Sequence, residues 1–93
     1  MDEVVRHDEK GNRFVIEIEG REALLEYSRE GNTLDFHRTF VPEELRGQGL
    51  AEKVVKAGFE YAREKGFKVR PSCSYVSGAF LKRHQEYNTL IVK

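Results

Sequence analysis

The stretch VPEELRGQGLAEKVV, residues 41–55, joins a predicted strand to the longest helical pattern of the chain. It places Gly47 and Gly49 at the entrance of that helix. Glycine lowers helix stability, so a pair of them here indicates a backbone that bends sharply or is approached closely by another group. The unpaired amide hydrogens of a helix N-terminus and the positive end of the helix dipole favour an anion at this position. The stretch therefore predicts a phosphate-binding turn between a strand and a helix.

Residues 49–65 follow the helical period, with one side apolar and the other charged. Gly66 is expected just beyond the C-terminal end, where glycine is common. The apolar side has two adjacent rows: Leu50, Val54 and Tyr61 with Ala57 or Gly58 between them, and Ala51, Val55, Phe59 and Ala62. This pattern predicts a surface helix that packs one face on a sheet.

Three strands are predicted before this helix, at residues 13–19, 22–29 and 34–41, with turns at residues 20–21 and 31–32. They read as an antiparallel meander. In the third strand, simple alternation places Leu34, Phe36, Arg38 and Phe40 on one face, and Asp35, His37, Thr39 and Val41 on the other.

After the helix, residues 67–76 predict another strand, interrupted or at an edge because of Pro71, with Val69 and also Cys73 and Tyr75 as inward candidates. A short helix is predicted near residues 77–86. Strand, long helix and strand in this order form a right-handed crossover, so residues 34–76 should be a βαβ unit with parallel strands. The fold class is α+β, an α/β sandwich, in a single domain over residues 1–93.

The amino-acid composition limits the classes of protein to which this chain can belong. With 39% hydrophobic and 34% charged residues and no run of 18 apolar residues, the sequence predicts a globular domain without a membrane span. The first residues lack the pattern of a secretory signal, and the single cysteine suits a reducing compartment, so we expect a cytoplasmic protein. Residues 1–45 contain six Lys/Arg against twelve Asp/Glu, whereas residues 46–93 contain ten against four, so the second half could favour an anionic ligand.

The distribution of basic residues and the spacing of histidine and cysteine argue against two kinds of site. The basic residues are interleaved with acidic ones and form no basic run with aromatics, so we expect no nucleic-acid partner. The three histidines and the cysteine, at positions 7, 37, 73 and 84, have no metal-ligand spacing, so we expect no metal.

Among glycine-rich phosphate loops, the Walker pattern is absent, and the dinucleotide fingerprint fails because Glu52 stands where a small residue is needed. What remains is Arg46-Gly47-Gln48-Gly49-Leu50-Ala51. The run from Val41 to Ala51, on a strand followed by an amphipathic helix, resembles the acyl-CoA-binding motif of the GNAT superfamily of acetyltransferases. Together with residues 71–75, PSCSY, and 83–87, RHQEY, it resembles the small GNAT-like acetyl-CoA-binding subfamily.

The resemblance implies a minimal GNAT fold: an antiparallel meander leading into a βαβ unit with splayed parallel strands, a long central helix and a short C-terminal helix. It implies acetyl-CoA as co-substrate, with the backbone of Val41 beside the pantetheine arm, the amides from Gly47 to Ala51 on the pyrophosphate, and Arg46 adding charge. The implied coenzyme-binding residues are Val41, Arg46, Gly47, Gln48, Gly49, Leu50 and Ala51.

Cys73 is the catalytic candidate that the subfamily implies, as a nucleophile if its pKa is lowered. The alternative is a small buried hydrophobic residue. His37 is the second catalytic candidate, but the subfamily usually carries histidine one position later, where this chain has Arg38. His37 therefore takes that role only if a β-bulge shifts the register. Arg38 could instead attract an anion or lower the pKa of Cys73.

Other residues have less support for a role in the site. His84 is expected to anchor the end of the short helix, and His7 to be solvated. On the short helix, Phe80, Lys82 and Arg83 could flank CoA, and Phe80 could equally belong to the core.

The function expected is an acetyl-CoA-dependent N-acetyltransferase that acts on an amine. The chain has no predicted helices between its first two strands, which implies an open cleft and favours a peptide or protein amine. A non-catalytic acyl-CoA-binding module and an interaction adaptor remain alternatives, in a monomer or weak homodimer.

Overall fold

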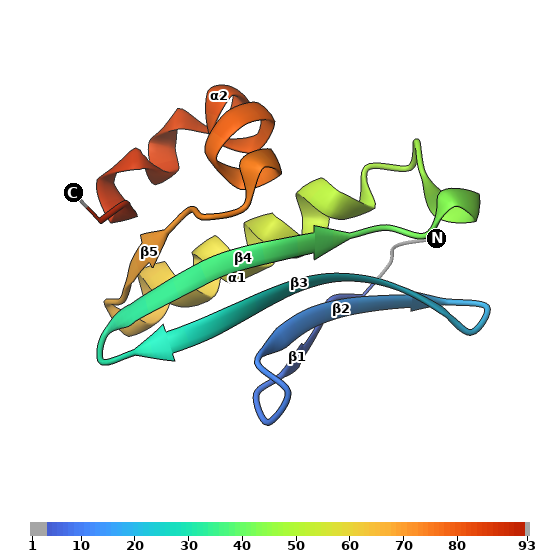
Figure 1. Ribbon diagram of the computed structural model, residues 1–93, viewed down its shortest axis with the longest axis horizontal. Helices are drawn as coiled ribbons and strands as arrows, with labels where there is room; N and C mark the ends of the chain where they lie inside the picture. Colours follow the sequence, from blue (N-terminus) through green and yellow to red (C-terminus); the bar gives the residue numbers. More distant parts are fainter. Residues whose placement is uncertain (1–3, 93) are drawn as a thin grey trace.

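The computed structural model describes residues 4–92, which form a five-stranded sheet under a layer of helices (Figure 1). The strands follow one another across the sheet in chain order, antiparallel except for the last pair, β4 and β5, which is parallel. This confirms the meander and the βαβ unit. Residues 1–3 and 93 of the predicted domain lie outside the described residues. The strands are β1 Arg6–Asp8, β2 Arg13–Ile18, β3 Arg21–Glu30, β4 Thr33–Phe40 and β5 Lys68–Arg70.

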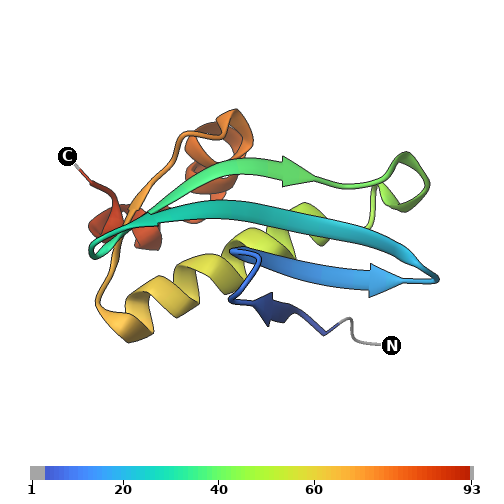
Figure 2. The same cartoon turned by 60° about the horizontal axis from the view of Figure 1, so that its bottom comes forward.

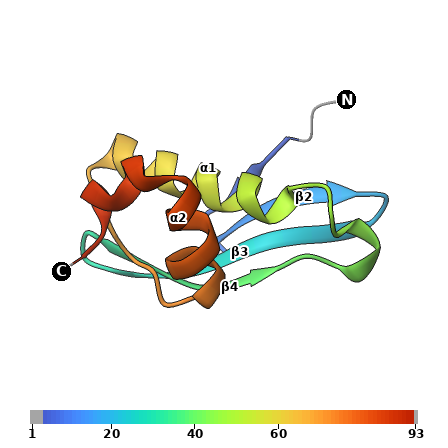
Figure 3. The ribbon, with the colours of Figure 1, turned by 90° about the horizontal axis from the view of Figure 1, so that it is seen from above.

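The helices lie on one face of the sheet, with the long α1 against the strands and the C-terminal segments packed beside it (Figure 3). In residues 4–92 no helix covers the opposite face. The helical elements are the short turn η1 Glu43–Leu45, α1 Leu50–Lys65, the π-helical turn η2 Val76–Phe80, α2 Leu81–Arg83 and the 3₁₀ segment η3 Gln85–Leu90. We refer to η2, α2 and η3 together as the C-terminal segment.

Helix α1 lies very close to the sheet because Gly58 faces it. A Cβ atom on Gly58 would stand 2.8 Å from Leu25 Cδ2 and 2.9 Å from Phe36 Cζ, and both of those side chains are buried. The helix ends as predicted at Gly66, whose φ of 76° is left-handed and whose amide donates to the carbonyls of Ala62 and Arg63. The predicted apolar rows supply its buried residues: Leu50, Val54, Val55, Phe59 and Ala62.

A β-bulge in β4 overturns part of the predicted face assignment. Tyr27 pairs with Phe36 but Glu26 pairs with Arg38, so His37 has no partner across the ladder. The extra residue reverses the alternation beyond it. Leu34 and Phe36 are buried as expected, but Arg38 and Phe40 are exposed on the other face. Thr39 instead pairs with the buried Leu25 and therefore faces the helices.

The sequence-based interpretation missed strand β1 and was wrong about His7. The His7 ring is half-buried, stacks on Phe14 at 4.0 Å between centroids, and hydrogen-bonds the Tyr27 hydroxyl at 2.7 Å. A histidine therefore fills the inward position of a three-residue polar strand, where hydrophobic alternation carries no signal. Partial burial lowers the pKa of His7, against the smaller opposing effect of Glu9 and Asp8.

The strand predicted over residues 67–76 is shorter than expected. β5 ends at Arg70, directly before Pro71, and Ser74 and Tyr75 already belong to a helical turn. The helix predicted near 77–86 is present and continues as η3 to Leu90. Phe80 is fully buried and stacks on Phe59 at 5.4 Å, so it is a core residue that fastens the C-terminal segment to α1.

Candidate functional site

The loop from β4 to α1 contains the two glycines that the sequence singled out (Figure 2). Gly47 has a φ of 87° and Gly49 a φ of 75°, a left-handed conformation that other residues adopt only with strain. A Cβ atom at either position would meet nothing within 4 Å. The glycines therefore serve the bend of the loop, and the space beside them is open to an incoming group.

This loop is rigidly placed at the start of α1. Leu45, buried at the end of η1, anchors it to the core, and the Leu45 amide donates to the Pro42 carbonyl at 2.9 Å. Gly49 is the residue before the first helical turn and offers no side chain to cap it. The first amides of α1 are thus available to a ligand, as at other anion-binding helix N-termini.

A cavity of about 290 Å³ opens at this loop, and we call it the loop cavity. It brings together six of the seven residues predicted to bind the coenzyme; Gln48 is not among its lining. Four further residues line it, and of these the sequence had suggested only Arg83, as a residue that could flank CoA. The predicted lining residues are Val41, Arg46, Gly47, Gly49, Leu50 and Ala51, and the additional ones are Leu45, Glu52, Tyr75 and Arg83.

The loop cavity has an arginine on each of two walls. Arg46 comes from the loop and donates through Nε to the Val41 carbonyl at 3.2 Å. Arg83 comes from α2, and its Nη1 lies 3.8 Å from Glu52 Oε2. The same carboxylate accepts a hydrogen bond from His84 Nε2 at 2.7 Å. That bond, followed by the charges of His84, Arg83 and Lys56, lowers the pKa of Glu52 despite its partial burial.

Cys73 lies where β4 and the chain after β5 separate. Its amide donates to the Phe36 carbonyl at 2.8 Å, and beyond that bond no ladder pair joins β4 to β5. The half-buried thiol lies 3.4 Å from the Thr39 hydroxyl. Ser77 donates to the Cys73 carbonyl at 3.0 Å, so Cys73 also caps the following helical turns.

The surroundings of Cys73 favour its thiolate. Partial burial raises the pKa of the thiol, but hydrogen bonds from the Thr39 hydroxyl and from the backbone amides of Val76, Tyr75 and Thr39 outweigh it, so the pKa lies below its ordinary value. Tyr75, whose amide is one of these donors, also lines the loop cavity, so the thiol is in contact with one of the cavity residues.

The structure does not bring Arg38 or His37 to the thiol. Arg38 Nη1 pairs with Glu26 at 3.1 Å, and its guanidinium lies 5.2 Å from the centre of the Phe40 ring, on the face opposite Thr39. The hypothesis that Arg38 lowers the pKa of Cys73 is wrong, because hydrogen bonds from Thr39 and the backbone do so. His37 is the exposed residue of the bulge. Its catalytic role stays a prediction.

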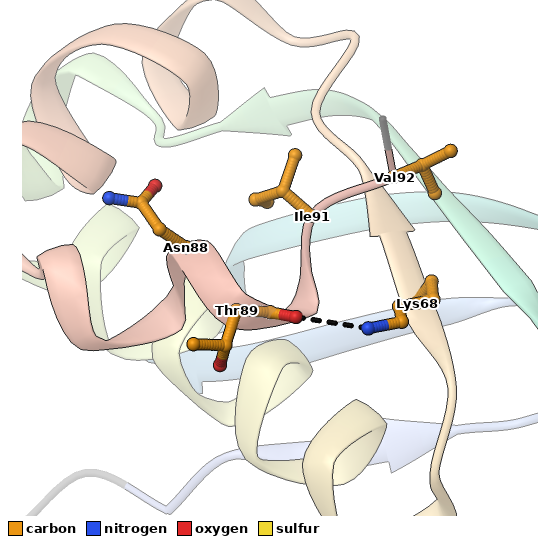
Figure 4. Close-up of a pocket in the computed structure, with 5 residues that line it drawn as sticks. All are labelled: Lys68, Asn88, Thr89, Ile91 and Val92. Carbon is orange, nitrogen blue, oxygen red and sulfur yellow. Dashed lines mark hydrogen bonds between the residues drawn. The ribbon is translucent and has the colours of Figure 1, made fainter.

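A second depression, of about 740 Å³, lies between β5 and the end of η3, beside the other end of α1 (Figure 4). It is larger than the loop cavity, but only one of its lining side chains is charged. Its one ammonium group, on Lys68, donates to the Thr89 carbonyl at 3.0 Å. Its lining has no glycine-rich turn or helix N-terminus, so its chemistry does not match the sequence motifs. The lining residues are Lys68, Asn88, Thr89, Ile91 and Val92.

Residues 4–92 contain no group of three histidine, cysteine or carboxylate side chains arranged as metal ligands. None of their helices has both the length and the apolar character needed to cross a bilayer.

Known proteins resemble this chain in sequence and in fold. A family model described as GCN5-related N-acetyl-transferase matches residues 13–90. Protein NATD1 of Danio rerio is 34% identical over 88 residues, covering 89% of this chain and 79% of the relative. Protein NATD1 of Xenopus tropicalis is 33% identical over 75 residues, covering 77% and 69%.

The fold comparison agrees with the sequence comparison. The solution structure of a GCN5-like protein of Staphylococcus aureus superposes with a TM-score of 0.71 at 30% identity, covering 96% of this chain and 87% of the other. The family match includes the glycine loop, Cys73 and the C-terminal segment, so it spans every element that forms the loop cavity. The chain belongs to the GCN5-related N-acetyltransferase family.

Proposed function

We propose that this protein is an acetyl-CoA-dependent N-acetyltransferase that moves an acetyl group to an amine, with a peptide or protein amine as acceptor. The family supports acetyl transfer in general. The observation that carries the proposal for this chain is the loop cavity, which joins the open glycine turn, the first amides of α1 and two arginines in one place.

These residues fit the anionic part of acetyl-CoA. The amides from Gly47 to Ala51, together with Arg46, would hold the diphosphate, since both the helix N-terminus and the guanidinium favour negative charge. Open space beside both glycines admits phosphate oxygens close to the backbone. The bound coenzyme supplies an acetyl thioester, which is activated toward nucleophiles.

In the direct route, the acceptor nitrogen bonds to the acetyl carbon and gives up a proton to water, the carbon–sulfur bond breaks, and the thiolate that leaves takes up a proton. Tyr75 is suited to give that proton and to regain one from water. It lines the loop cavity, and partial burial, with the charges of Glu52 and Cys73, raises the pKa of its hydroxyl, which therefore stays protonated at neutral pH.

In the two-step route, the Cys73 thiolate bonds to the acetyl carbon and the coenzyme leaves as its thiolate. The amine nitrogen then bonds to the acetyl carbon and gives up a proton to water, and the Cys73 thiolate leaves. The lowered pKa of Cys73 supports this route, since the thiolate is the nucleophile. The two routes differ in a measurable way: only the second leaves an acetyl group on Cys73 when no amine is present.

The acceptor side of the site is open. The connections between successive strands from β1 to β4 are short turns, so no helix inserted between these strands encloses the site. A large acceptor such as a peptide meets no enclosing wall there. This favours an amine on a peptide or protein over a small amine that needs an enclosed pocket for its recognition.

One observation favours a second candidate function, a non-catalytic acyl-CoA-binding module. His37 is exposed on the bulge, while the Thr39 hydroxyl and backbone amides supply the hydrogen bonds to the Cys73 thiol. Such a module would bind acetyl-CoA through the same loop without a base to deprotonate an amine.

The experiment combines binding with turnover. Purified protein is incubated with radiolabelled acetyl-CoA and a peptide library with free amines, and the Cys73→Ala and Tyr75→Phe variants are run beside the wild type. We expect acetylated peptide with the wild type and a loss of rate in at least one variant. Binding without transfer to any amine would favour the module, and absence of binding would remove both functions.

A further inference from the structure

The geometry points to Arg83 as a second phosphate-binding side chain of the loop cavity, from a different segment than Arg46, with Glu52 as the residue that positions it. The inference rests on the proposed function, because the phosphates in question are those of CoA. Arg83 belongs to the C-terminal segment, which is distant in sequence from the glycine loop and is brought to the cavity by the fold.

Two walls of the loop cavity come from different parts of the chain. The loop supplies Arg46 and the glycines, while Arg83 comes from the C-terminal segment and Tyr75 from the helical turn just before it. Both arginines therefore line one cavity although they are far apart in sequence. CoA carries a diphosphate and a further phosphate, more negative charge than one arginine can balance. Arginine binds phosphate with paired, charge-assisted hydrogen bonds.

The Arg83 guanidinium is available to bind phosphate. Its side chain is 71% exposed, and the ion pair with Glu52, at 3.8 Å, is longer than a hydrogen bond. A guanidinium has five N–H donors, so this contact leaves donors for phosphate oxygens. Arg83 is also the last residue of α2, and the ring of its half-buried neighbour His84 stacks on the buried Phe80.

The presence of Glu52 needs an explanation, since a carboxylate on an anion site repels the ligand. Glu52 is held by His84 Nε2 at 2.7 Å. The His84 ring stacks on the buried Phe80 at 4.5 Å, and the His84 amide donates to the Phe80 carbonyl at 3.0 Å. Glu52 thus connects α1 to the end of α2 next to Arg83. We assign it a positioning role that outweighs its repulsion.

The test compares Arg83→Gln with Lys82→Gln. Both remove one positive charge from the same short helix, but Lys82 lines a different surface together with Ser77 and Gln85. Each variant is titrated with CoA and with acetyl-pantetheine, which lacks the nucleotide and its diphosphate. We expect Arg83→Gln to weaken CoA binding about tenfold, the effect of losing a charge-assisted hydrogen bond, and to leave acetyl-pantetheine binding unchanged. Lys82→Gln should change CoA binding less than about twofold.

Three results would overturn the inference while the proposed function stands: equal CoA affinities of the two variants, an equal loss for acetyl-pantetheine in Arg83→Gln, or tighter CoA binding by Glu52→Gln. The last variant removes a negative charge from an anion site, so simple electrostatics predicts tighter binding and the positioning role predicts weaker binding. A wild-type protein that does not bind CoA would instead remove the proposed function itself. Thermal unfolding of each variant checks that the fold is intact.

Discussion

The Thr39 hydroxyl lies 3.4 Å from the Cys73 sulfur, and a β-bulge makes this contact possible. Without the extra residue in β4, Thr39 would face away from the helices. Because of the bulge, Thr39 rather than Arg38 lies on the face of β4 that contacts the thiol. The hydrogen-bonding environment of Cys73 depends on this register.

Replacing Thr39 by Val should raise the pKa of Cys73, because it removes a hydrogen bond that lowers this pKa and keeps a similar shape. The thiolate fraction at neutral pH then falls, by about tenfold for each unit of pKa. We expect alkylation by iodoacetamide to be several times slower at neutral pH, with its pH midpoint displaced upward. Thr39→Ser, which keeps the hydroxyl, is the control. Identical midpoints for all three proteins would contradict the assigned role of Thr39.

Gly47→Ala and Gly49→Ala should each destabilise the fold by about 1 kcal/mol, the cost of a side chain at positive φ, and each should also weaken CoA binding. Gly20 provides the matched control. Its φ of 80° is also left-handed and its surroundings are open, but it lies in the turn between β2 and β3. Gly20→Ala should therefore cost similar stability without loss of CoA affinity. A comparable loss of affinity in Gly20→Ala would mean that the loop glycines act only through stability.

Gly58→Ala tests the close packing of α1 on the sheet. Alanine favours a helix by about 1 kcal/mol, but the added methyl group would meet Leu25 and Phe36 at less than 3 Å, and overpacking of a core costs about 1–3 kcal/mol. We expect a net loss of stability in urea unfolding. Lys56→Ala, at an exposed position of the same helix, should change stability little. A more stable Gly58→Ala protein would show that the sheet accommodates the methyl group.

The pKa of Glu52 lies below its ordinary value of 4.5, so the native state favours the ionised carboxylate. A group with a depressed native pKa contributes stability above its unfolded pKa and loses it as the pH falls through the native pKa. The stability difference between wild type and Glu52→Gln should therefore be present at neutral pH and disappear in acid. Urea unfolding at several pH values measures it. A difference that persists unchanged below about pH 3 would exclude the charge of Glu52 as its source.

Much of the fold was predictable because its signals are local. Alternating apolar residues in β2 and the start of β4, glycines in the turns and the two apolar rows of α1 each act within a few residues. The bulge was not predictable. Beyond Phe36 the strand continues with His37, Arg38 and Thr39, which are all polar, so alternation no longer reports which face each one occupies. Strand β1 was missed for the same reason, since its inward residue is His7.

In the candidate site, too, the residues that are close together in sequence were predictable and those brought in by long-range contacts were not. Six of the seven predicted coenzyme residues line the loop cavity because they belong to one continuous segment. Tyr75 was missed as a cavity residue, and Arg83 was suggested only as one of three residues that could flank CoA, because the stacking of Phe80 on Phe59, a long-range contact, brings their segment to α1. Both residues do lie in the stretches 71–75 and 83–87 that supported the family resemblance, and those stretches were the available signal.

The proposed function assigns the diphosphate of acetyl-CoA to the backbone amides of residues 47–51. Backbone amide spectra recorded during a titration with acetyl-CoA test this assignment. We predict saturable shifts at residues 47–51, with Arg83 affected and the turn at Gly20 unchanged. An absence of shifts at millimolar ligand, or shifts confined to the depression around Lys68 and Ile91, would contradict it.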